Sequence, residues 1–176
     1  MRSPVRQLVL LTFALVAVWG CAEEGDPSGG LDPNISEAPL PGDASGSEHA
    51  GAWTLELYYS SCTGVCSFDT ILGVASVCDV GETATQIVEA TQTDGSIRFE
   101  GNGLPSRYDG GVDASGDFDL LGVATQDGGN IEIRVRVQGA FDGDSLAGAA
   151  RGRTMGTIDD QTINCRYDVE VTGTRG

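Results

Sequence analysis

Alternation of apolar and polar side chains runs through this chain from Gly51 onward, and it is the feature that most constrains the fold. In one segment Ile131, Ile133, Val135 and Val137 alternate with charged or amide side chains. A period of two residues indicates antiparallel strands that bury one face. Asp-Gly pairs between these segments supply the positive φ that tight hairpins need. The pattern predicts strands at 52–60, 84–92, 95–101, 106–112, 116–125, 129–140, 144–153 and 161–172.

These eight predicted strands, joined by short hairpins, form a meander with one apolar face. Closing the sheet on itself covers that face and leaves no exposed edge. We therefore expect an all-β fold, an antiparallel up-and-down barrel of eight strands, with a two-sheet β-sandwich as the alternative. Segment 68–78 is compatible with a ninth strand, a short helix or a structured loop.

The N-terminal residues have the pattern of an export signal. Two arginines precede an apolar run from Leu8 to Trp19, which is shorter than the roughly 20 residues that span a bilayer. Residues 18–21 then resemble a bacterial lipobox, whose cysteine is acylated and becomes the new N-terminus. We expect residues 1–20 to be a lipoprotein signal peptide and Cys21 to carry the lipid, with an ordinary secretory signal as the alternative. Glu23 stands where an Asp would resemble the inner-membrane retention signal, which favours the outer membrane.

Residues 22–50 are rich in proline, glycine and acidic side chains, and they contain no arginine. Few apolar residues and uniform negative charge leave little to offset the entropy cost of ordering. The composition predicts a disordered acidic tether over 21–50, beginning at the lipidated cysteine, and a folded domain over 51–176.

The charge and the residue types exclude several classes of function. The chain has 26 acidic and 10 basic residues and a formal net charge of −16, whereas binding nucleic acid requires a basic surface. The only histidine, His49, falls in the predicted tether, so the domain has no imidazole base. The acidic clusters, such as the one formed by Asp113, Asp117 and Asp119, lack EF-hand spacing, and turn-forming aspartates explain nearly all of them. We expect no enzymatic activity, no bound metal and no cofactor.

Four cysteines remain in the domain, namely Cys62, Cys66, Cys78 and Cys165. They lack the paired Cys-x-x-Cys units of zinc sites, and an exported protein favours disulfides. In an even-stranded barrel the last strand lies antiparallel to the first, which favours Cys62–Cys165 with Cys66–Cys78. Counting 70–77 as a strand would instead favour Cys62–Cys66 with Cys78–Cys165.

The start and the end of the domain resemble the lipocalins and other calycins. Gly51-Ala52-Trp53 is similar to their Gly-x-Trp at the first strand, and Arg175 follows the last strand where that family places an arginine over the tryptophan. The resemblance implies a barrel in which a cation lies over the indole of Trp53, with a structural role for both residues.

Side chains on the apolar face would line the barrel lumen. An eight-stranded barrel either fills with its own side chains or holds one small ligand. Small inward residues such as Gly122 and Ala150 are compatible with a cavity or with a curved wall. We expect the protein to bind or carry a small apolar ligand beside the membrane. The alternative is a structural or protein-interaction lipoprotein with a solid core and an envelope protein as partner. The expected lumen residues are Trp53, Leu55, Leu57, Phe99, Phe118, Leu120, Ile133, Val135, Tyr167 and Val169.

Overall fold

The computed structural model describes residues 33–71, 73–158 and 160–176. The predicted signal peptide, the lipobox-like motif and Cys21 lie outside these residues. Within the described ranges, no helix has the length and apolar character needed to cross a membrane.

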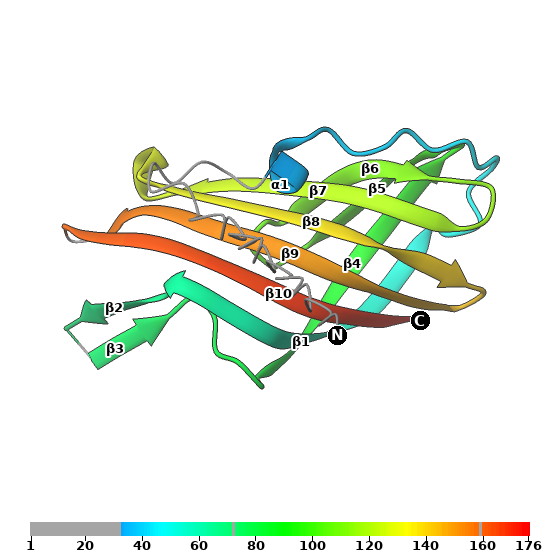
Figure 1. Ribbon diagram of the computed structural model, residues 1–176. Helices are drawn as coiled ribbons and strands as arrows, with labels where there is room; N and C mark the ends of the chain where they lie inside the picture. The colour runs from blue at the N-terminus through cyan, green and yellow to red at the C-terminus, as the bar shows by residue number, and fades with distance from the viewer. Residues whose placement is uncertain (1–32, 72, 159) are drawn as a thin grey trace, which may run out of the picture. The chain divides into compact units, whose positions relative to one another are not determined.

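Eight antiparallel strands close into a barrel in the order β1-β10-β9-β8-β7-β6-β5-β4 (Figure 1). The predicted up-and-down barrel is therefore confirmed, and the two-sheet sandwich is not what forms. The barrel closes where β1 pairs with both β4 and β10. The strands are β1 (Gly51–Val65), β4 (Thr83–Thr93), β5 (Ser96–Gly101), β6 (Arg107–Val112), β7 (Asp117–Gln126), β8 (Ile131–Asp142), β9 (Ser145–Ile158) and β10 (Gln161–Arg175).

The apolar residues that alternate with polar ones in the sequence are the buried residues of the strands. In β10, Ile163 is 1% exposed and Val171 is 3% exposed, whereas the side chains between the inward positions are exposed or half-buried. Each large apolar side chain that is removed from water contributes about 1.5–3 kcal/mol. The hairpin turns use the predicted chemistry, because Asp94 has φ 51° and Gly143 has φ 60°.

Segment 68–78 forms a small hairpin outside the barrel sheet. Its strands are β2 (Ser67–Thr70) and β3 (Gly73–Ser76), which pair only with each other (Figure 1). The hairpin follows the end of β1, and after it the chain runs back along β1. The backbone N–H of Val77 donates a hydrogen bond to the carbonyl of Cys66, and the backbone N–H of Gly81 donates one to the carbonyl of Tyr59.

The four domain cysteines form two disulfides, Cys62–Cys78 and Cys66–Cys165. The expectation that these cysteines are oxidised is confirmed, but the favoured pairing of Cys62 with Cys165 and of Cys66 with Cys78 is wrong. The alternative that pairs Cys62 with Cys66 is wrong as well.

The register of β1 against β10 explains the pairing. β1 extends to Val65, beyond its expected end at residue 60, and its register shifts at a bulge. As a result Tyr167 lies opposite Cys62, and Cys165 lies opposite Gly64. Cys165 therefore lies closer to Cys66, the residue that follows β1, than to Cys62. After the β2–β3 hairpin, the chain runs back along β1 and places Cys78 beside Cys62, with which it forms the other disulfide.

Residues 35–50 pack along the barrel and so differ from the predicted disordered tether. The segment begins in the second half of a four-residue helix, α1 (Pro33–Ser36), that contacts β8 and β9. Ile35 is 1% exposed and Ala44 is 4% exposed. Composition averaged over 22–50 hides these apolar anchors.

The barrel wall also supplies polar partners to this segment. The backbone N–H of Leu40 donates to the carboxylate of Asp119 at 2.8 Å, and that of Ala44 donates to the carbonyl of Val112 at 3.1 Å. Asp119 forms a buried ion pair with Arg136 at 2.6 Å. Asp119 on the barrel wall therefore binds the 35–50 segment through a backbone N–H, although the segment itself is acidic.

Candidate functional site

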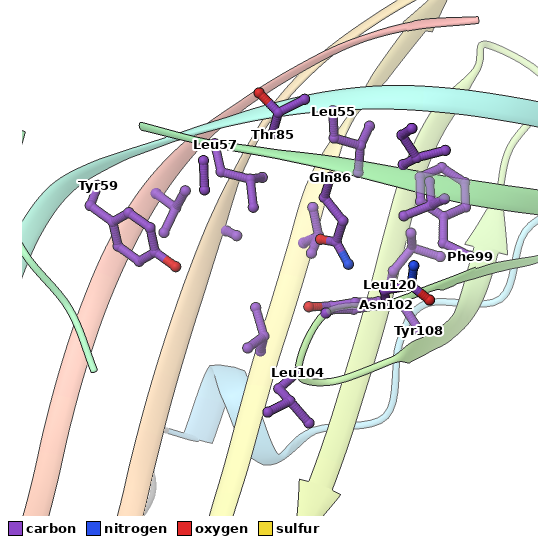
Figure 2. A pocket seen from close by; sticks show the side chains of 18 of the residues that line it. Leu55, Leu57, Tyr59, Thr85, Gln86, Phe99, Asn102, Leu104, Tyr108 and Leu120 are labelled. Atoms are coloured by element: carbon purple, nitrogen blue, oxygen red, sulfur yellow. The ribbon is translucent and has the colours of Figure 1, made fainter. Parts of the chain in front are cut away.

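The barrel contains a cavity of about 520 Å³. Strand β1 forms part of its wall together with β4, the loop between β5 and β6, and inward side chains of β7 to β10 (Figure 2). Leu104 from that loop lines the cavity and is 55% exposed, which places the loop at the opening to solvent. Eight of the expected lumen residues line the cavity, namely Leu55, Leu57, Phe99, Phe118, Leu120, Val135, Tyr167 and Val169.

Two expected lumen residues lie elsewhere. Ile133 is buried in the core, where it lies opposite Ala124 on β7 and Thr154 on β9, and it does not reach the cavity. Trp53 is completely buried and belongs to the closed end of the barrel. Their strands place both side chains inward as expected, but at these two positions the side chains contact other side chains instead of open space.

The closed end is filled by the side chains of His49, Trp53 and Phe141, which we call the barrel plug. Trp53 Nε1 donates a hydrogen bond to the carbonyl of His49 at 3.0 Å. The imidazole of His49 stacks on Phe141 with ring centroids 4.1 Å apart. The guanidinium carbon of Arg175 lies 5.5 Å from the centroid of the Trp53 ring, which is the arrangement that the calycin resemblance implies.

Sequence reasoning missed the role of His49, which it placed in the tether. Burial lowers the pKa of His49, the neighbouring carboxylate of Glu48 raises it in part, and the positive charge of Arg175 lowers it further. The neutral imidazole therefore behaves as a flat ring that closes the barrel. Phe99 and Phe118 contact Phe141 and also line the cavity, so they form the cavity floor.

Three tyrosines place hydroxyl groups around the cavity, and the sequence reasoning named only Tyr167 among them. Burial raises the pKa of Tyr167 to about 12, opposed in part by a hydrogen bond with Thr154. Burial also raises the pKa of Tyr108 and that of Tyr59. All three phenols are therefore neutral at physiological pH, and each offers a donor and an acceptor.

Glycines in the wall make room for two of these rings. A Cβ at Gly122 would lie 2.7 Å from the Tyr108 ring, and one at Gly152 would lie 2.0 Å from the Tyr167 ring. The sequence places Gly122 inward and leaves open whether it makes a cavity or lets the wall curve. The ring of Tyr108 occupies the space beside Gly122, and the cavity lies next to this ring.

The side chains that line the cavity include none that is acidic or basic. The polar groups are the three phenols and the side chains of Thr85, Gln86 and Asn102. Sequence reasoning identified none of the last three as a lining residue. Gln86 had a signal, since a polar residue at an inward position of β4 interrupts the alternation. Loop residues such as Asn102 had none, because periodicity carries no information in a loop.

The acidic residues Asp113 and Asp117 take part in a turn. A carboxylate oxygen of Asp113 accepts hydrogen bonds from the backbone N–H groups of Ser115 at 2.8 Å and Asp117 at 3.0 Å, as a turn-forming Asp does. Among the residues that the structure describes, no three His, Cys, Asp or Glu side chains are grouped as a metal ion would need.

A comparison of the chain with protein-family models finds no match, and neither does a comparison with curated protein sequences.

Proposed function

We propose that this protein is a non-enzymatic lipoprotein of the cell envelope whose barrel binds or carries a small apolar ligand. The observation that carries the proposal is the cavity of about 520 Å³ with no charged lining side chain. Ligand pockets are usually apolar clefts of about 300–1,000 Å³ with a few polar groups. Aliphatic and aromatic side chains form most of this wall, so that ligand binding would be driven by burial of apolar surface.

The closed end supports the same proposal. A ligand cavity needs a floor that excludes water, and the barrel plug with Phe99 and Phe118 supplies one. The contact of Arg175 with Trp53 is consistent with a calycin-like barrel, the architecture that the ends of the domain resemble.

The anchoring part of the proposal rests on the lipobox-like motif at residues 18–21. The two disulfides support export, because disulfides persist mainly in oxidising compartments. A lipid on Cys21 would hold the barrel beside a membrane, where apolar ligands are concentrated.

Binding can be measured with N-phenyl-1-naphthylamine, a neutral apolar dye whose fluorescence rises when it leaves water. We expect the domain to bind the dye, and we expect Val137→Trp to lower the affinity at least about tenfold, or about 1.4 kcal/mol. Val137 lines the cavity from β8, so that a tryptophan there would occupy the space of the dye.

The matched control is Val123→Trp, because Val123 faces solvent on β7 and is 48% exposed. We expect this variant to bind the dye as the wild type does. A wild-type domain that leaves the fluorescence of the dye unchanged would contradict the binding function and favour the solid-core alternative.

For the anchor, we expect Cys21→Ser to move the protein from the membrane fraction to the soluble fraction when cells that produce it are fractionated. The lipid is attached through the thiol, which serine lacks. Trp19→Ala keeps the cysteine and should stay in the membrane fraction. Unchanged membrane partition of Cys21→Ser would refute the lipobox assignment.

A second candidate function, docking to an envelope protein, is favoured by the β2–β3 hairpin. Ile71 at its turn is fully exposed, and Val74 is 73% exposed. Exposed apolar side chains on a hairpin between two disulfides are typical of an interaction surface. This function is compatible with ligand binding, since neither residue lines the cavity.

A further inference from the structure

The cavity contains a buried side-chain nitrogen, Gln86 Nε2, that lacks a hydrogen-bond partner. Gln86 lies on the inward face of β4, two residues before Val88, which is 2% exposed. Figure 2 shows its side chain directed from β4 into the cavity, toward the loop that carries Asn102. Its Nε2 atom is buried and donates no hydrogen bond.

A glycine of the β5–β6 loop leaves room for this amide. A Cβ at Gly103 would lie 2.2 Å from Gln86 Nε2, so that the loop leaves room for the amide without offering it an acceptor. A buried donor without a partner destabilises the structure that contains it. Gln86 has rotatable side-chain bonds, so its amide can turn from Gly103 toward an acceptor that enters the cavity.

The rest of the wall limits what that acceptor can be. Neither Arg, Lys nor His is among the lining side chains, and the three phenols are neutral. A carboxylate in the cavity would lose its water and meet no cation, which costs far more than burying a neutral carbonyl that receives a hydrogen bond.

We infer that the cavity selects neutral ligands that carry a hydrogen-bond acceptor, such as an ester or ketone, and that Gln86 Nε2 donates to that acceptor. The inference rests on the proposed binding function and names the class of ligand. The apolar body of the ligand lies against the aliphatic wall, and its carbonyl lies near the β5–β6 loop. Carboxylates of equal chain length are rejected.

The test compares methyl decanoate with decanoate at pH 8, where decanoate is ionised. Each competes with bound N-phenyl-1-naphthylamine, and the loss of fluorescence reports the affinity of the competitor. In the wild type we expect the ester to bind at least tenfold more tightly than the carboxylate. In Gln86→Leu, which keeps an apolar side chain of similar size, we expect about fivefold weaker ester binding.

Gln126→Leu is the matched control, because Gln126 is exposed at the end of β7. It should bind both the dye and the ester as the wild type does. The ester affinity of Gln86→Leu is compared with the dye affinity of the same variant, so that a change in the cavity that affects every ligand is separated from the loss of the hydrogen bond. Equal affinity of wild type and Gln86→Leu for the ester, or equal wild-type affinity for ester and carboxylate, would overturn the inference while dye binding still supports the proposed function. Failure of the wild type to bind both dye and ester would overturn both.

Discussion

Removing the Cys66–Cys165 disulfide with the double variant Cys66→Ala and Cys165→Ala is expected to lower the free energy of unfolding by about 5 kcal/mol. The bridge joins residues 99 positions apart, so that it restricts most of the unfolded domain. Urea denaturation followed by circular dichroism measures the loss. A loss of this size is a large fraction of the 5–15 kcal/mol of a typical domain, and the variant is expected to be largely unfolded at modest denaturant concentration.

The other bridge supplies the matched control. Cys62–Cys78 joins residues 16 positions apart, and the same chain-entropy relation gives about 3 kcal/mol for the variant Cys62→Ala and Cys78→Ala. The order of the two losses is the informative result, since it depends on which cysteines are joined. Equal losses, or peptide mapping without reduction that finds Cys62 joined to Cys165, would contradict the connectivity.

Truncation of Trp53 is expected to have the second large effect. Trp53 is fully buried at the centre of the barrel plug, where it contacts Phe141 and donates a hydrogen bond to His49. Trp53→Ala removes these contacts and leaves a void, which typically costs about 3–5 kcal/mol. The decrease in the free energy of unfolding can be measured by the same urea denaturation.

Tyr58→Ala is a suitable comparison because Tyr58 lies on the same strand, faces outward and is 41% exposed. Its truncation should change the free energy of unfolding by about 0.5 kcal/mol or less. Similar losses for Trp53→Ala and Tyr58→Ala would show that the barrel plug does not stabilise the domain.

These two effects concern the parts of the molecule that enclose the cavity. The barrel plug closes one end, and the disulfides fix the chain that leaves β1 beside the strand that closes the barrel. A preformed cavity reduces the ordering that a ligand must impose when it binds. Stability and the proposed binding function therefore depend on many of the same side chains.

Much of the candidate site followed from periodicity alone. Alternation is a local property, and it places a side chain on one face of a strand wherever that strand lies in the sheet. Leu55, Leu57, Leu120 and Val135 line the cavity for this reason. The same argument does not locate a residue along the barrel axis, and for this reason Trp53 and Ile133 were expected in the lumen although they lie in the packed core.

The sequence by itself determined the all-β class, the eight strands and their turns, because apolar alternation and Asp-Gly pairs act through neighbouring residues. Tertiary structure alone decided the disulfide pairing, which depends on the register between β1 and β10. It also decided that residues 35–50 pack on the barrel, since Ile35 and His49 find partners only on a surface built from distant strands. The unpartnered Nε2 atom of Gln86 is also decided by tertiary structure, because its hydrogen bonding depends on the loop that folds over it and not on its neighbours in the chain.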